Sequence, residues 1–163
     1  MKYRRLSNDE LAQLELQFIR FLSAQSITGE DWKKTKENDP QRAEELIGQF
    51  SDIVIEKTLH NVQYLEYKEP RDIKTFHCQD DKITMRGLFA EGGDGLDFTG
   101  EMSPAEMNEV MKNSGATLKV YTAEKGYKDG DRLAEIFKML ESGCKISPDG
   151  ALYKSFGVMV GGE

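Results

Sequence analysis

The first sixty residues repeat apolar positions with the period of an α-helix. Ser7 and Glu10 form a capping-box pattern, in which the hydroxyl accepts from an early helical N–H while the carboxylate reaches back. Behind them, apolar side chains recur three or four positions apart, which places them on one stripe: Leu11, Leu14, Phe18, Phe21 and Leu22. We predict a helix that begins after Ser7 and ends near Ser26.

Two further helix starts follow in the same part of the chain. Residues 28–31 can cap a short helix that carries Trp32. Asp39 can cap the next helix, with Pro40 at its first position, where the missing N–H costs nothing. Apolar residues continue at helical spacing beyond it, so we predict a helix as far as about Leu59.

The pattern then changes to short runs that are typical of strands. Residues 62–67 are rich in aromatic and aliphatic side chains. Residues 73–78 and 82–90 flank a polar Gln79–Asp81 turn, which predicts a hairpin. Residues 116–123 alternate apolar and polar positions as a fourth strand does.

Helical segments return around and after this fourth strand. Ser103 begins a capping-box pattern with Pro104 at the first helical position, and a full helix is predicted from about Asp129 to Gly143. A last short helical piece begins at Ser147-Pro148, and residues 158–163 are expected to form a loosely ordered tail. Helices followed by a small sheet predict an α+β fold, with about three to four antiparallel strands packed against several helices. No linker divides the chain, so a single domain over residues 1–163 is expected.

The charge balance narrows the classes of partner. The chain has 163 residues and holds 22 Lys and Arg against 29 Asp and Glu, for a net charge of −7. Binding to a phosphate backbone draws on Lys and Arg that replace counterions, so this excess of acid argues against nucleic acid. No apolar run reaches the roughly 18 residues of a membrane span, and Met1 leads into charged residues and not into a signal peptide. We therefore expect a cytoplasmic protein that binds neither nucleic acid nor membrane.

The main electrostatic feature is a run of six carboxylates, without Lys or Arg, between residues 87 and 111. Oxygen-rich flexible segments suit hard cations such as Mg²⁺ or Ca²⁺. The candidate metal ligands are Glu91, Asp94, Asp97 and Glu101. The spacing departs from an EF-hand loop, because no Glu stands at the twelfth position counted from Asp94. A solvated acidic loop is the simpler interpretation, since charge runs usually mark exposed segments, and no cofactor is otherwise expected.

The nucleophiles form no recognisable catalytic set. Cys144 follows a predicted helix C-terminus, where the helix dipole disfavours a thiolate. Cys78 follows His77 directly, but neighbouring side chains of a strand point to opposite faces, so the two cannot form a dyad there. No serine elbow, P-loop or dinucleotide fingerprint is present. Aromatic residues would line a ligand pocket or, more commonly, fill the core: Tyr64, Tyr67, Phe76, Phe89, Phe98 and Tyr121.

Several segments resemble an uncharacterised family of small bacterial proteins, a domain of unknown function. They are residues 1–7, 50–54, 56–57, 64–66, 120–125, 137–144 and 146–147. The resemblance covers nearly the whole chain and implies a cytoplasmic bacterial protein with a single domain. It carries no residue roles.

The favoured hypothesis is a non-catalytic cytoplasmic module that binds a protein partner or associates with itself. Its expected contact surfaces are the acidic 91–101 loop and the region around Trp32. The alternative is a divalent-metal-dependent hydrolase, in which the acidic 91–101 loop holds a metal that activates water. Binding of a small ligand in an aromatic pocket is left open.

Overall fold

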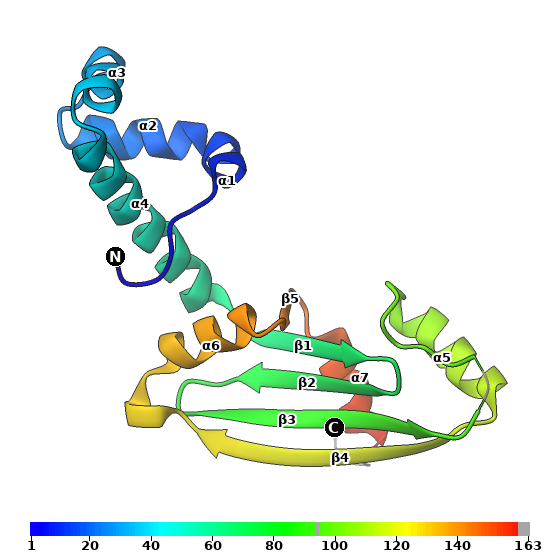
Figure 1. Cartoon of the computed structure of the whole chain (residues 1–163). Helices are drawn as coiled ribbons and strands as arrows, with labels where there is room; N and C mark the ends of the chain where they lie inside the picture. The colour runs from blue at the N-terminus through cyan, green and yellow to red at the C-terminus, as the bar shows by residue number, and fades with distance from the viewer. Residues whose placement is uncertain (94, 160–163) are drawn as a thin grey trace. The chain divides into compact units, whose positions relative to one another are not determined.

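The structure is a computed structural model that describes residues 1–93 and 95–159. It contains helices and one antiparallel sheet, so the fold is α+β, as the sequence predicts (Figure 1). The chain divides into two compact units, Met1–His60 and Asn61–Glu163, and each is described by itself. The single domain expected over residues 1–163 stays a prediction.

The first unit is helical. Its helices are α1 (Asn8–Gln13), α2 (Glu15–Ala24), α3 (Gly29–Asn38) and α4 (Pro40–Asn61). The first predicted helix is thus two helices, which meet at Leu14, where the backbone leaves the helical region (φ −107°, ψ 22°). Nothing in the local sequence explains this break.

Capping explains where two of these helices begin. Ser7 caps α1 and Thr28 caps α3, and each forms the reciprocal capping box with an acidic residue three positions on. The prediction at Ser7 and Glu10 is confirmed.

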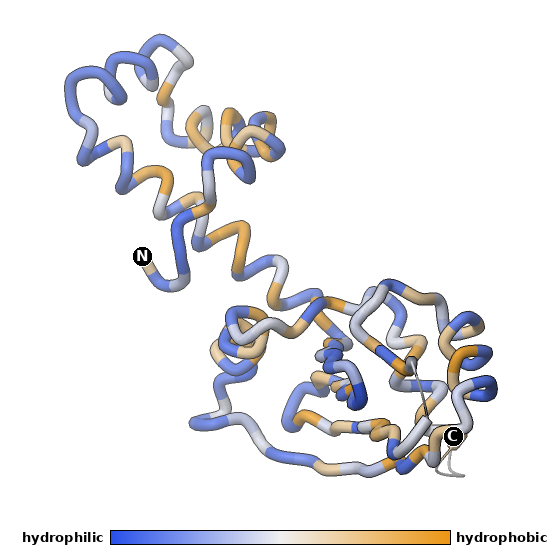
Figure 2. The backbone as a smooth tube through the Cα atoms, turned by 45° about the vertical axis from the view of Figure 1, so that its right-hand side comes forward, coloured by the Kyte–Doolittle hydropathy of each residue, from blue (hydrophilic) through white to orange (hydrophobic). Residues whose placement is uncertain are grey.

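An aromatic cluster holds the first unit together. Phe18 of α2 packs against Phe50 of α4, with ring centroids 5.0 Å apart, and edge-on against Trp32 of α3 at 5.1 Å. Figure 2 shows apolar positions recurring along these helices with hydrophilic positions between them. Their stripes meet in this cluster, because helical side chains three or four positions apart share a face.

The segment before α1 packs along α4. The backbone N–H of Leu6 donates to the buried hydroxyl of Ser51 (2.9 Å), and the guanidinium of Arg5 binds both carboxylate oxygens of Glu44, at 2.8 and 3.1 Å. The basic start of the chain is therefore used in structural ion pairs.

The second unit contains a five-stranded antiparallel sheet in the order β4-β3-β2-β1-β5. The strands are β1 (Tyr64–Glu69), β2 (Asp72–Cys78), β3 (Lys82–Glu91), β4 (Thr117–Gly126) and β5 (Lys145–Ser147). The predicted hairpin at residues 73–90 is confirmed. The sheet has one strand more than the upper limit of the three to four expected. The additional strand is β5, which begins before the point where a helix was expected.

Helices cover parts of this sheet. They are α5 (Pro104–Ser114), the short 3₁₀ helix η1 (Lys128–Gly130), α6 (Arg132–Glu141) and α7 (Ala151–Met159). Helix α7 lies across one face of the sheet and packs on β2 and β3 (Figure 1). Val158 and Met159 of the predicted loose tail belong to this helix, and residues 160–163 lie outside the described residues.

The main core of the second unit lies between α7, α5 and the sheet. Its fully buried side chains include Ile73, Leu88, Phe98, Met107 and Phe156. Ile73 and Leu88 are opposite each other on β2 and β3, so they present one apolar patch to α7. Polar residues lie on the same face, further along β2 and back along β3. Some of them line the candidate site.

Candidate functional site

The acidic segment does not form one cluster in the described residues. Glu91 ends β3 and makes an ion pair with Lys119 of β4 at 2.8 Å. Asp97 accepts hydrogen bonds at one oxygen, Oδ1, from the backbone N–H and the hydroxyl of Thr99, at 2.9 and 2.6 Å. These interactions lower the pKa of both carboxyl groups. Asp94 lies outside the described residues.

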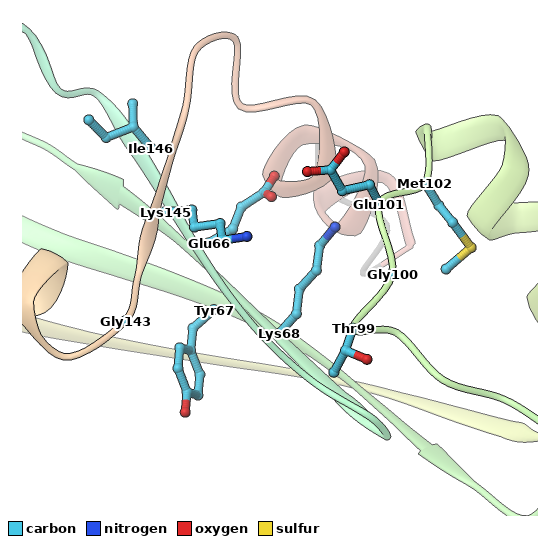
Figure 3. Close-up of a pocket in the computed structure, with 10 residues that line it drawn as sticks. All are labelled: Glu66, Tyr67, Lys68, Thr99, Gly100, Glu101, Met102, Gly143, Lys145 and Ile146. Carbon is cyan, nitrogen blue, oxygen red and sulfur yellow. The ribbon is translucent and has the colours of Figure 1, made fainter. Parts of the chain in front are cut away.

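Glu101, the fourth predicted ligand, lines a separate pocket of about 310 Å³ (Figure 3). Glu66 and Lys68 of β1 and Lys145 of β5 line it too, and Tyr67 points away from them. Its two acidic and two basic residues balance, and neither Glu91 nor Asp97 reaches it. Among the described residues, no group of three His, Cys, Asp or Glu side chains can hold a metal ion. The metal site therefore stays a prediction.

A larger cleft of about 750 Å³ lies between α7 and the sheet. It is lined by four residues of β1–β3 and the β2–β3 turn, and by four of α7: Tyr64, His77, Gln79 and Arg86, then Tyr153, Lys154, Ser155 and Val158. We call it the α7 cleft. Ligand sites in proteins are commonly clefts of about 300–1,000 Å³.

Three rings form the floor of the α7 cleft. Tyr64 and His77 stack with ring centroids 4.6 Å apart and planes 19° apart, because they are opposite each other in the β1–β2 register. Tyr153 of α7 contacts both rings, at 5.6 and 5.5 Å. The start of α7 approaches closely because Gly150 has no side chain: a Cβ there would lie 2.6 Å from the Tyr64 ring.

Two cations lie against these rings. The guanidinium of Arg86 is 4.0 Å from the ring centroid of Tyr153, and its Nη1 donates to the Tyr153 carbonyl oxygen at 3.0 Å. The ammonium of Lys154 is 5.5 Å from the Tyr64 centroid. Cation–π contacts of this kind hold a charge over an aromatic face and leave its sign unchanged.

The protonation of His77 follows from this setting. Burial lowers the pKa of His77, and the positive charges of Arg86 and Lys154 lower it further. The imidazole is therefore neutral near pH 7. No acidic residue is among the described residues that line the cleft.

Sequence reasoning missed most of this cleft. Tyr64 was considered as a pocket residue, but Arg86, Tyr153 and Lys154 were not. The sequence feature that could have indicated the cleft was Arg86, a charged residue in the middle of the largely apolar predicted strand at 82–90. Its partners lie more than sixty residues further on in α7, and only the tertiary fold brings them together.

The surroundings of the two thiols disfavour the thiolate form. Burial raises the pKa of Cys78 to about 11 and also raises the pKa of Cys144. His77 and Cys78 are neighbours on β2, and Cys78 is buried while His77 lines the α7 cleft. The sequence argument against a Cys–His dyad is therefore confirmed.

The outermost strand β4 is the other prominent surface of the second unit. It pairs with β3 along ten residues, from Thr117 opposite Glu91 to Gly126 opposite Lys82. In the part of the chain that the structure describes, no strand pairs with its other side (Figure 1). At the opposite edge of the sheet, β5 has only three residues.

The chain belongs to a protein family of unknown function, DUF6495, whose sequence profile matches residues 1–161. The family resemblance expected from the sequence is thereby confirmed. No curated protein and no solved structure matches the chain. No helix within residues 1–93 and 95–159 has both the length and the apolar character needed to cross a membrane.

Proposed function

We propose that this protein is a non-catalytic cytoplasmic module that associates with itself through β4. Two copies would pair their β4 strands antiparallel and join their sheets into one. The observation that carries the proposal is the long, unpaired outer side of β4 in the described chain. Unpaired edge strands present rows of N–H and C=O groups that template pairing with another chain.

Proline and a bulge, two of the usual protections of an edge strand, are absent from β4. Proteins block such edges with proline, bulges, short strands or charged side chains. Residues 117–126 contain no proline, and their register with β3 runs without a bulge. The charged residues each contact an opposite charge of their own chain: Lys119 with Glu91, Glu124 with Lys82 and Lys125 with Glu135, at 2.8–3.4 Å.

Strand length and charge together select the register of the proposed pair. Among pairs centred on a residue, those centred on Tyr121 or Thr122 match the most residues of Thr117–Gly126. In such a pair, a two-fold axis perpendicular to the sheet relates the two copies, so each face of one sheet continues into the same face of the other. Residues that are opposite each other across the two β4 strands must therefore lie on the same face. Centring the pair on Thr122 would place Lys119 opposite Lys125 of the copy, which like-charge repulsion disfavours. Centring it on Tyr121 places Lys119 opposite Ala123 and leaves no like charges facing each other. We propose the Tyr121-centred register.

The chemistry of the described residues supports a binding role and not a catalytic one. The two thiols have raised pKa values. His77 contacts rings and cations, and no Cys, Asp or Glu is among the described residues that line its cleft. The excess of acidic residues favours a protein partner, here a second copy, over nucleic acid or a membrane. A pair made by one strand alone buries less surface than the roughly 1,200–2,000 Å² of a stable complex, so the dimer should dissociate in the micromolar range.

Sedimentation velocity across micromolar to near-millimolar concentrations tests the proposal. The wild type should show a reversible monomer–dimer equilibrium. Ala123→Lys should weaken it by about tenfold or more, because two symmetric Lys–Lys pairs then face each other across the strands. Ala123→Glu is the matched control: it changes the same exposed position but faces Lys119, so it should keep or strengthen the dimer.

The double variant Lys119→Glu/Ala123→Lys should restore association, because the facing charges are again opposite. Circular dichroism checks that each variant is folded. A wild type that remains monomeric at every concentration would contradict the proposal. Equal dimerisation of Ala123→Lys and Ala123→Glu would contradict the register.

A further inference from the structure

The pocket that Glu101 lines lies between the edge strand β5 and the segment before α5. We call it the β5 pocket, and its volume is about 310 Å³. Glu66 and Lys68 are two positions apart on β1, so their side chains leave the same face of the strand. Lys145 of β5 is opposite Glu66 and shares that face. Figure 3 shows these three side chains and that of Glu101 pointing into one space.

The four charged side chains of the β5 pocket do not neutralise one another by contact. Within residues 1–93 and 95–159, none of the four makes a side-chain hydrogen bond or an ion pair. The neighbouring cations Arg86 and Lys154 line the α7 cleft and not this pocket, and Thr75 of β2 lies between Glu66 and Arg86 in the sheet. Opposite charges therefore face each other across the space that a ligand would occupy.

Two carboxylates and two ammonium groups in one hollow select a ligand that carries both charges. A ligand with charge of one sign would be attracted by one pair and repelled by the other. An ammonium group offers three donors, and a carboxylate accepts at two oxygens. A small zwitterion can therefore form charge-assisted hydrogen bonds with both pairs at once.

The size and the remaining lining of the pocket favour a small ligand with an apolar part. Its volume of about 310 Å³ is at the lower end of the roughly 300–1,000 Å³ that is typical of ligand sites. Met102 and Ile146 lie on either side of the charged groups (Figure 3), and Ile146 is 44 % exposed. A ligand that covers Ile146 removes apolar surface from water, which favours binding.

We propose that the β5 pocket binds a free α-amino acid with an apolar side chain. The ammonium group of the ligand donates to Glu66 and Glu101, and its carboxylate accepts from Lys68 and Lys145. Its side chain lies against Ile146. The proposal does not depend on self-association through β4, because β4 and β5 are at opposite edges of the sheet.

Titration of the isotope-labelled full chain with L-leucine, followed by NMR of the backbone amides, tests the proposal. We expect saturable shifts at residues 66–68, 99–102 and 143–146, which surround the pocket, and none in β4. The comparison probes are L-leucinamide, which lacks the carboxylate, N-acetyl-L-leucine, which lacks the ammonium group, and glycine, which lacks the side chain. Each should bind at least about tenfold more weakly than L-leucine.

Paired substitutions locate the two kinds of charge. Glu101→Gln and Lys145→Gln, both at exposed positions, should each weaken L-leucine binding by about tenfold. Glu109→Gln and Lys112→Gln on α5 make the same changes at exposed positions outside the lining, and they should leave binding unchanged. Glu101→Gln should not weaken the binding of N-acetyl-L-leucine, which has no ammonium group for Glu101 to hold. Circular dichroism checks that each variant is folded.

Three results would overturn the proposal. The first is the absence of a saturable shift around the pocket up to the solubility limit of L-leucine. The second is binding of L-leucinamide, N-acetyl-L-leucine or glycine as tightly as L-leucine. The third is equal weakening by the pocket substitutions and the control substitutions on α5.

Discussion

Gly157 of α7 packs directly against the guanidinium of Arg86, so that a Cβ on Gly157 would overlap Nη1 of the arginine. The contact fixes how far Arg86 extends along α7. Arg86 also contacts the ring and the carbonyl of Tyr153, so the position of this glycine is tied to the geometry of the α7 cleft.

Gly157→Ala should therefore displace the guanidinium of Arg86 at little cost in stability. Alanine stabilises a helix interior by about 1 kcal/mol relative to glycine, which offsets part of the cost of moving Arg86. We expect the free energy of unfolding to change by less than about 1 kcal/mol. The pKa of His77 should rise, because the positive charge of Arg86, which lowers it, moves away, and NMR titration of the histidine ring protons measures this change. Gly48→Ala in α4 is the control, since its Cβ would meet only Met1 atoms at 3.6 Å or more. An unchanged pKa of His77 in Gly157→Ala would contradict this role for the glycine.

Gly87→Ala should destabilise the sheet. The ring of Tyr121 on β4 lies over Gly87 on β3, where a Cβ would overlap it, and the Tyr121 hydroxyl donates to Asp72 at 2.5 Å. Alanine would push the ring off and break that hydrogen bond. We expect a loss of about 1–3 kcal/mol, measured by urea unfolding in dilute solution. A cost that persists in a Tyr121→Ala background would show that the ring is not its source.

The capping box of α1 should contribute stability that depends on pH. The pKa of Glu10 is lowered to about 2, first by Arg4 and then by the backbone N–H of Ser7. Because the folded pKa lies below the unfolded value, the stabilisation is present above about pH 4.5 and is lost as the pH falls towards 2. The side chain is 40 % exposed, so solvent screening keeps the effect below about 1 kcal/mol.

Unfolding of wild type and Glu10→Gln at pH 7 and pH 2 measures this contribution. The variant should be less stable at pH 7, and the difference should be smaller at pH 2, where about half of Glu10 is protonated. A difference in the free energy of unfolding that is the same at pH 7 and pH 2 would mean that the charge of Glu10 does not contribute to stability.

Divalent cations should not bind saturably at the acidic 91–101 loop. Lys119 holds Glu91, and Thr99 engages Asp97, so neither carboxylate is preorganised for a shared ion. Calorimetric titration with Mg²⁺, Mn²⁺ and Ca²⁺ should give dilution heats only. A saturable heat that disappears in Asp94→Ala/Asp97→Ala would instead support the metal-dependent alternative.

Local signals in the sequence predicted much of the fold. The Ser7 capping box, Pro40 at the start of α4, and the polar turn at 79–81 each depend on residues close in the chain. Strand β5 was missed for the opposite reason. It has three residues without an apolar alternation of their own, and it exists because Ile146 and its neighbours pair with β1, some eighty positions earlier.

The site was harder to predict than the fold. The acidic run was visible in the sequence, but its carboxylates are divided between separate partners. Arg86 and Lys154 have no sequence pattern in common, because β3 and α7 meet only after the sheet has formed. Tyr121 was considered as a core or pocket residue, and in the structure its ring covers Gly87 on the neighbouring strand β3.

Hydrogen exchange of β4, followed by mass spectrometry as a function of protein concentration, tests self-association most directly. The account predicts that amides of residues 117–126 become more protected as concentration rises, while the β1–β2 hairpin at residues 64–78 exchanges at a constant rate. Exchange in β4 that does not change over the whole concentration range would contradict pairing through this strand.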